Sequence, residues 1–124
     1  MNKSFLTAGA LLAAVAVIGG AFGAHFLKAR LTAESLQTFE TAVRYQFYHA
    51  IALLVAGALY KEFSNQWIKM AGYFFLAGII LFSGSLYGLC ASPAIRWLGP
   101  VTPLGGLCFI LGWGLLALGF TKKN

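Results

Sequence analysis

Long apolar runs without a charged residue alternate along the chain with short polar segments. Three of these runs, residues 4–27, 70–95 and 97–121, each exceed the roughly 20 residues that a helix needs to cross a bilayer. A fourth run, residues 45–60, provides only about 24 Å of helix, so its helix must begin near Thr41 to span. The pattern therefore predicts membrane spans at about residues 5–27, 41–60, 68–90 and 100–120.

A helix start is predicted ahead of the second span. The hydroxyl of Thr32 can accept a hydrogen bond from the first turn as an N-cap, and Glu34 suits the positive end of the helix dipole. Apolar residues then recur every three or four positions from Leu36 to Phe47, which gives the helix one apolar face. Two interpretations stay open: residues 33–41 lie on the membrane surface before the span, or they belong to one long tilted helix.

The amino-acid composition agrees with a membrane environment. Of the 124 residues, 60% are apolar and 10% are charged, whereas soluble domains carry about a quarter charged residues. A water-exposed globule of this composition would present large apolar patches. The formal charge of +6 does not indicate nucleic-acid binding, because the cations flank the apolar runs and form no basic stripe. We therefore expect a single-domain, all-α integral membrane four-helix bundle whose partner is the lipid bilayer.

Small residues line one face of several predicted spans. Such stripes let membrane helices approach closely, either within one chain or between copies, so a homo-oligomer stays open. The helix-packing residues predicted in this way are Gly9, Ala13, Ala16, Gly20 and Ala24 in the first span, Gly84 and Gly88 in the third, and Gly105, Gly112 and Gly119 in the fourth.

The first span also has features of a secretory signal. Lys3 precedes an apolar stretch, and small residues at positions 21–24 suit a cleavage site. Against this interpretation, the apolar stretch is longer than the usual 7–15 residues of a signal core. A disposable peptide also has no need of a packing stripe, so we expect a retained helix.

The positive charges predict an orientation. With four spans, both termini and the loop at residues 61–69 share one side of the membrane. That side carries Lys3, Lys61, Lys69, Lys122 and Lys123, and the other side carries Lys28, Arg30, Arg44 and Arg96. Because cytoplasmic flanks are richer in Lys and Arg, we expect the termini to face the cytoplasm.

Polar side chains gather near one end of the predicted bundle, opposite the termini. A polar group in lipid costs free energy unless it faces protein or water, so these side chains should point inward and bond one another. The candidate polar site comprises His25, Arg44, Tyr45, Gln46, Tyr48, His49, Ser83, Ser85, Tyr87 and Thr102.

Spacings of four residues favour contacts within this site. Glu40 and Arg44, Arg44 and Tyr48, and Tyr45 and His49 are each one helical turn apart. Arg44 lies about one turn inside the span and can extend its guanidinium back to the headgroups. Two roles stay open for the site: hydrogen bonds that hold the bundle together, or binding of a lipid, a small solute or a partner helix.

The sequence carries no nucleotide-binding, hydrolase, zinc-protease or paired C-x-x-C motif. His25 and His49 are expected at different depths, which disfavours a shared haem or metal. The same argument disfavours a disulfide between Cys90 and Cys108, which we interpret as small buried apolar residues. We expect no enzymatic activity, no cofactor and no metal site.

Four segments taken together are similar to a known family. They are GAFGAH at residues 20–25, ETAVRYQFYHA at 40–50, FSGSLY at 82–87, and GPVTPLGG at 99–106 followed by Gly112-Trp113. Over the whole chain they resemble the YgdD/YwdK-like family of small bacterial membrane proteins of unknown function, which has relatives in eukaryotes. The Tyr-Gln-x-Tyr-His run is the most specific piece. The resemblance implies a four-span plasma-membrane protein without an assigned reaction, and it supplies no catalytic or binding residues.

These observations favour a non-enzymatic membrane protein of unknown biochemical activity, with the polar end as the candidate site for a lipid, a small solute or a partner helix. The alternative is an oligomeric small-solute or ion channel or transporter. A channel needs a continuous polar path, and the half of each helix opposite the polar end is built from apolar residues and glycine. A pore would therefore have to lie between subunits.

Overall fold

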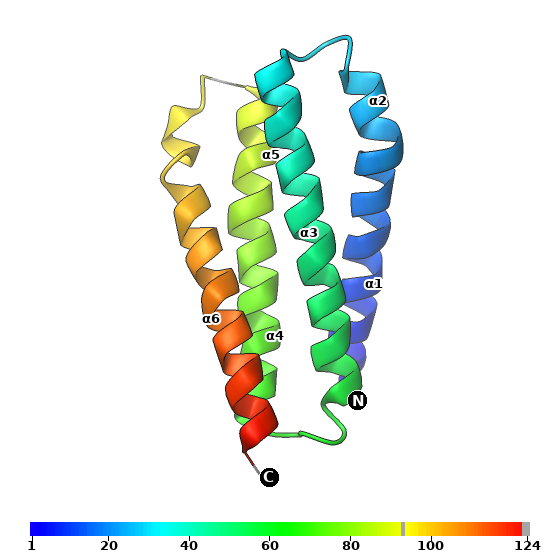
Figure 1. Ribbon diagram of the computed structural model, residues 1–124, viewed down its shortest axis with the longest axis vertical. Coiled ribbons are helices and arrows are strands. Elements are labelled where there is room, and N and C mark those ends of the chain that lie inside the picture. The colour runs from blue at the N-terminus through cyan, green and yellow to red at the C-terminus, as the bar shows by residue number, and fades with distance from the viewer. Residues whose placement is uncertain (93, 123–124) are drawn as a thin grey trace.

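The computed structural model describes residues 1–92 and 94–122 as four antiparallel helical rods (Figure 1). The first rod comprises α1 (Lys3–Ile18), the π-helical turn η1 (Gly19–Gly23) and α2 (Ala24–Leu27), and the second is α3 (Ala33–Leu59). The third comprises α4 (Gln66–Gly78), the π-helical turn η2 (Ile79–Ser83) and α5 (Gly84–Ala91). The fourth comprises the short 3₁₀ turn η3 (Arg96–Leu98) and α6 (Val101–Thr121). The predicted all-α four-helix bundle is confirmed.

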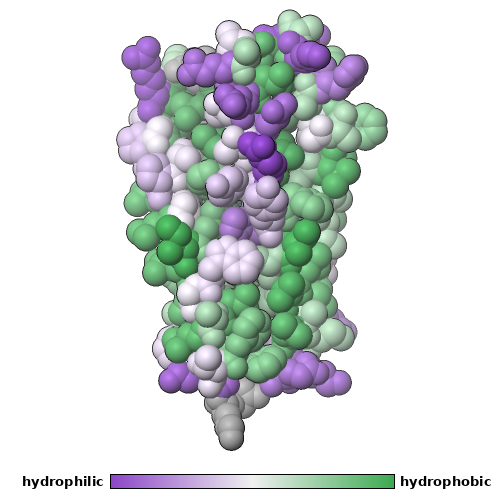
Figure 2. All heavy atoms as spheres, viewed as in Figure 1, coloured by the Kyte–Doolittle hydropathy of each residue, from purple (hydrophilic) through white to green (hydrophobic). Residues whose placement is uncertain are grey.

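Each rod is long and apolar enough to cross a membrane. The continuous helical stretches are Lys3–Leu27, Ala33–Leu59, Gln66–Ala91 and Arg96–Thr121, of 25, 27, 26 and 26 residues. Large apolar side chains face outward, among them Phe22, Ile80 and Ile110 with 68–70% of their surface exposed. Figure 2 shows a mainly hydrophobic band between two hydrophilic ends. This is the surface that hydrocarbon, and not water, would cover.

Both termini and the α3–α4 connection lie at one end of the bundle, as the four-span pattern predicts (Figure 1). We call this the terminal end, and the opposite end, which holds the α2–α3 and α5–η3 connections, the polar end. Lys3, Lys61, Lys69 and Lys122 belong to the terminal end. Lys123, which we also predicted there, lies outside the described residues.

Helix α3 begins at its predicted cap. The Thr32 hydroxyl accepts a hydrogen bond of 3.1 Å from the backbone N–H of Ser35, and Glu34 lies in the first turn. The helix then continues without a break to Leu59. Of the two open interpretations, one long helix is therefore the one observed, with its first turns extending beyond the predicted span.

The packed apolar core lies toward the terminal end. It consists of Phe5, Ala52, Leu53, Ala56, Ile68, Ala71, Phe75 and Leu116, so all four rods contribute to it. Phe5, Leu53, Ile68 and Phe75 are at most 2% exposed. These side chains fill the space between the helices at this end.

Glycines set the closest helix contacts in the bundle. A Cβ added at Gly9 would lie 2.9 Å from the Ala50 carbonyl oxygen, so α1 approaches the backbone of α3 directly. On α6, Gly105 faces the backbone of Phe82, Gly112 faces the Phe75 ring, and Gly119 faces Ile68. These glycines therefore allow close packing of the helices, as their spacing predicts.

Other members of the small-residue stripes pack less closely or not at all. Ala16 is buried, Ala13 and Ala24 are half-buried, and an added Cβ at Gly20 would meet only Val43. Gly88 faces the Leu98 side chain, which belongs to η3 and not to a long helix. Gly84 is exposed and an added Cβ there would have no neighbour within 4 Å, so of the two contacts left open by the sequence Gly84 does not make the one within this chain.

Candidate functional site at the polar end of the bundle

Gln46 connects three of the four rods. Its side-chain Nε2 donates a hydrogen bond of 2.8 Å to the Leu12 carbonyl oxygen on α1. Its Oε1 accepts a hydrogen bond of 2.7 Å from the Tyr87 hydroxyl on α5. The Gln46 side chain is 3% exposed, so both bonds form where water does not compete. The amide therefore holds α1 and α5 against α3.

Two serines on the third rod form further contacts between helices. The Ser83 hydroxyl, which is fully buried, donates a hydrogen bond of 2.8 Å to the Ala42 carbonyl oxygen on α3. The hydroxyls of Ser85 and Thr102 bond each other and so join α5 to α6. Ser85 is also within 2.9 Å of the Phe82 carbonyl oxygen. Both serines thus hold neighbouring helices together through hydrogen bonds.

His49 lies deeper in the bundle, past the midpoint of α3, and is fixed by two hydrogen bonds. The Trp113 indole Nε1 is 3.0 Å from His49 Nε2, and His49 Nδ1 is 2.7 Å from the Tyr45 carbonyl oxygen. An indole nitrogen only donates and a carbonyl oxygen only accepts, so the imidazole is neutral with its proton on Nδ1. The Phe109 ring stacks on it with centroids 3.5 Å apart. Both ring nitrogens of His49 are therefore engaged in contacts within the bundle.

Every buried side-chain nitrogen or oxygen of the described residues has a hydrogen-bond partner. The buried polar atoms of Gln46, His49, Ser83 and Ser85 therefore each have a partner within the protein. Of the two roles that the sequence left open, the buried part of the polar site supports the structural one. A ligand would have to break these bonds to use the same groups.

Four members of the predicted site are exposed. Tyr45 is 38% exposed and Tyr48 is 53% exposed, while His25 and Arg44 are also exposed. The prediction of an inward orientation is wrong for His25, Arg44 and Tyr48, because their positions on the helix turn them toward the membrane side. Tyr45 keeps interior contacts: its ring packs against Phe82 with centroids 4.6 Å apart, and its backbone carbonyl bonds His49.

The predicted contacts of Arg44 are also absent. Within the part of the chain that the structure describes, Arg44 forms neither an ion pair with Glu40 nor a hydrogen bond with Tyr48. Its guanidinium has one long hydrogen bond of 3.4 Å, to the hydroxyl of Thr41. The guanidinium thus keeps most of its five N–H donors free.

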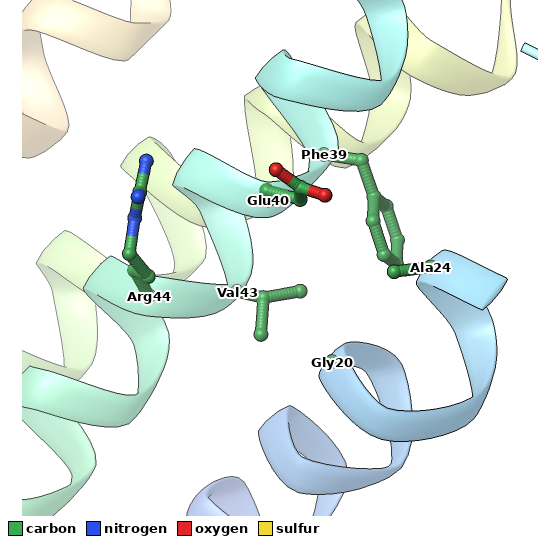
Figure 3. Close-up of a pocket in the computed structure, with 6 residues that line it drawn as sticks. All are labelled: Gly20, Ala24, Phe39, Glu40, Val43 and Arg44. Carbon is green, nitrogen blue, oxygen red and sulfur yellow. The ribbon is translucent and has the colours of Figure 1, made fainter. Parts of the chain in front are cut away.

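Arg44 lies between two neighbouring cavities on the outer side of the bundle. The first, of about 280 Å³, is lined by Gly20, Ala24, Phe39, Glu40, Val43 and Arg44 (Figure 3). The second, of about 210 Å³, is lined by Ala16, Val17, Val43, Arg44, Phe47 and Tyr48. Because Val43 and Arg44 line both, we treat the two cavities as one groove between the first rod and α3, the α1–α3 groove.

Local backbone structure explains where this groove forms. The π-helical turn η1 interrupts α1 at Gly19–Gly23, next to the stretch of α3 that carries Phe39 and Val43. An added Cβ at Gly20 would lie 3.3 Å from Val43, so the missing side chain leaves the space open. Single π-helical turns in α-helices occur frequently at functional sites. The groove is therefore the stronger candidate for a binding site.

The described residues offer no cluster of three His, Cys, Asp or Glu side chains that could hold a metal ion. Cys90 and Cys108 are both free. Cys90 is buried, with its thiol near the Ser35 carbonyl oxygen, whereas Cys108 is only half-buried, which corrects the predicted burial of Cys108.

Sequence reasoning missed Trp113 and Phe109, the two residues of α6 that contact the His49 ring. Their four-residue spacing places them on one face of α6, which is a signal that they act together. It did not indicate that this face meets His49. The carbonyl of Leu12 has no signal in the sequence at all.

The fold and the site define a multi-pass α-helical membrane protein whose rods are joined by buried polar contacts. The chain belongs to the family described as protein of unknown function (DUF423), whose family model matches residues 19–106. No biochemical activity is assigned to this family, in agreement with the resemblance seen in the sequence.

Several relatives are similar over nearly their whole length. The chain is 42% identical over 121 residues to the UPF0382 membrane protein YwdK of Bacillus subtilis, covering 97% of this chain and 98% of the relative. It is 44% identical over 120 residues to a UPF0382 membrane protein of Staphylococcus aureus, covering 97% of each. A UPF0382 membrane protein of Haemophilus influenzae is 42% identical over 126 residues, covering 100% of this chain and 98% of the relative. No solved structure matches the chain.

Proposed function

We propose that this protein is a non-enzymatic plasma-membrane protein that binds a phospholipid in the α1–α3 groove. The observation that carries the proposal is the position of Arg44 on the wall shared by two cavities, without a carboxylate partner. An arginine within a membrane-spanning helix is costly unless an anion or water compensates its charge. A lipid phosphate would supply that anion.

The chemistry of the guanidinium fits this role. Arginine offers a planar set of N–H donors that binds phosphate through two parallel hydrogen bonds. Side chains on a helix lean toward its N-terminus, which for Arg44 is the polar end of the bundle. The guanidinium is therefore directed toward the depth at which lipid headgroups lie.

The second cavity suits the acyl part of the same lipid. Ala16, Val17 and Phe47 supply apolar lining on the side of Arg44 that faces the terminal end. Tyr48, which is 53% exposed, borders the same space. An acyl chain lying there would bury apolar surface on both partners, while the phosphate remains beside Arg44.

The packing of the bundle does not support the alternative of a channel through one chain. Phe5, Leu53, Ile68 and Phe75 are almost fully buried and fill the interior at the terminal end. The polar groups above them bond one another and do not line an open path. An enzymatic role is likewise not favoured, because the buried His49 is engaged at both ring nitrogens.

Native mass spectrometry of protein extracted gently from its own membrane tests lipid binding. We expect the wild-type protein to retain one phospholipid, and Arg44→Ala to reduce the retained fraction about tenfold, which corresponds to about 1.4 kcal/mol. Arg96→Ala is the matched control, because Arg96 is exposed at the same end and lies outside the groove. Equal retention by wild type and Arg44→Ala, with both variants folded, would contradict the proposal.

We further propose that the termini face the cytoplasm. The sequence assigns five cations to the side of the termini, Lys3, Lys61, Lys69, Lys122 and Lys123, against four on the other side, and cytoplasmic flanks are enriched in such cations. In this orientation the groove opens toward the outer leaflet. Labelling a single cysteine introduced at Ser64 or at Thr32, in a variant lacking Cys90 and Cys108, tests it. A membrane-impermeant reagent applied to intact cells should modify only the cysteine at position 32.

A further inference from the structure

Two opposite charges line the first cavity of the α1–α3 groove without pairing. Glu40 and Arg44 are one turn apart on α3, both are exposed, and both belong to the cavity wall (Figure 3). Residues at this spacing commonly form an ion pair. Here the guanidinium bonds the Thr41 hydroxyl, and the Thr41 hydroxyl in turn bonds the Gln37 carbonyl oxygen. The carboxylate of Glu40 stays available to a ligand.

The cavity therefore presents one negative and one positive group to the same ligand. A headgroup that carries only negative charge would be attracted by Arg44 and repelled by Glu40. A headgroup with both a phosphate and an ammonium would satisfy both side chains. The two groups of such a headgroup are joined by a short linker, so they can reach side chains one helical turn apart.

The remaining lining indicates which ammonium fits. A primary ammonium donates N–H hydrogen bonds that a carboxylate accepts. A quaternary ammonium has no N–H group and is recognised by a cage of aromatic rings. Among the described residues that line this cavity, Phe39 is the single aromatic one. The cavity thus offers the carboxylate that a primary ammonium requires, and no cage.

We propose that the lipid bound in the α1–α3 groove carries an ethanolamine-type headgroup, with its phosphate on Arg44 and its primary ammonium on Glu40. This inference rests on the proposed function, since it specifies the headgroup of the same bound lipid. In this arrangement Glu40 determines which headgroup is preferred, and Arg44 determines how tightly the lipid binds. Substitution of Glu40 should therefore change the headgroup preference, and substitution of Arg44 should change the amount of bound lipid.

The experiment compares headgroups at equal acyl composition. The full-length protein is reconstituted in nanodiscs containing equal amounts of phosphatidylethanolamine, phosphatidylglycerol and phosphatidylcholine, and the lipids that stay bound are identified by native mass spectrometry. We expect the wild-type protein to retain phosphatidylethanolamine about tenfold over each competitor. Glu40→Gln should retain a similar total amount of lipid with the preference lost. Glu34→Gln is the matched control, because Glu34 lies on α3 outside the cavity.

The outcomes separate this inference from the proposed function. If wild type retains phosphatidylglycerol or phosphatidylcholine as well as phosphatidylethanolamine, and Arg44→Ala loses all three, lipid binding stands and the headgroup assignment is wrong. If Glu40→Gln keeps the full preference, the assignment of the ammonium to Glu40 is wrong. If Arg44→Ala retains lipid like wild type, the proposed function and the inference both fail.

Discussion

The indole N–H of Trp113 on α6 donates a hydrogen bond of 3.0 Å to Nε2 of His49 on α3, across 64 positions of sequence. The same imidazole stacks on Phe109 and lies tilted against the Phe75 ring with centroids 5.8 Å apart. The α3–α6 contact near the middle of the bundle is therefore organised around one neutral histidine. In an apolar surrounding, an unpaired hydrogen-bond donor or acceptor costs free energy. The bond between Trp113 and His49 therefore also favours the rotation of α3 and α6 about their axes that brings the two side chains together.

Replacing Trp113 by phenylalanine should destabilise the bundle by about 1 kcal/mol, because the ring contacts remain while Nε2 of His49 loses its donor. The free energy of unfolding in mixed detergent micelles measures the effect. Trp97→Phe is the matched control, since Trp97 is 71% exposed at the polar end. Equal losses in both variants would show that the His49 bond contributes nothing specific.

Replacing Gly105 by alanine should destabilise the bundle by about 1–3 kcal/mol, the usual cost of overpacking. The added methyl would collide with backbone atoms of Phe82, which cannot rotate away as a side chain can. Gly114→Ala is the control, because nothing lies within 4 Å of an added Cβ there. We expect that variant to be unchanged or slightly more stable, because alanine favours a helix over glycine. Thermal unfolding in detergent that ranks the two variants the other way would refute the α6–η2 contact.

Replacing Tyr87 by phenylalanine should lower the free energy of unfolding by about 1 kcal/mol, because the Oε1 of buried Gln46 loses its donor. Gln46→Leu removes this bond and the one to the Leu12 carbonyl oxygen. A double-mutant cycle should therefore show coupling of at least about 0.5 kcal/mol between the two positions. Purely additive effects would indicate that the two side chains do not bond in the membrane.

The intact mass of the protein isolated from its membrane should correspond to a chain that retains the first helix. Phe5 of α1 is 2% exposed within the core that α3, α4 and α6 complete. Loss of α1 would leave a large cavity there and would uncover Gly57, at which an added Cβ would lie 3.0 Å from Phe5 Cβ. A mass that lacks the first 24 residues would contradict the retained helix, since residues 21–24 offer the small-residue cleavage pattern.

In the α1–α3 groove, the spacing of residues predicts their neighbours along the helix but not their contacts. The spacing of Glu40 and Arg44 predicted a contact, and the chain places the two groups side by side on a cavity wall without joining them. The difference arises because the Arg44 guanidinium bonds the Thr41 hydroxyl, a side-chain conformation that residue spacing does not encode. The groove also lies beside η1, a π-helical turn with one extra residue that a hydropathy profile does not register. The same kind of turn, η2, brings Ser83 to the Ala42 carbonyl oxygen on the opposite side of α3.

The sequence by itself determined the four apolar helices and the end of the bundle at which each segment lies. Uncharged runs, flanking cations and the Thr32 cap place every segment along the helix axes, because transfer into hydrocarbon depends on composition and length. Only the tertiary structure decided which way each helix face points. Gly84 and Gly105 both belong to predicted small-residue stripes, yet one faces outward and the other faces Phe82. That rotation depends on close packing among all four rods, which no single helix encodes.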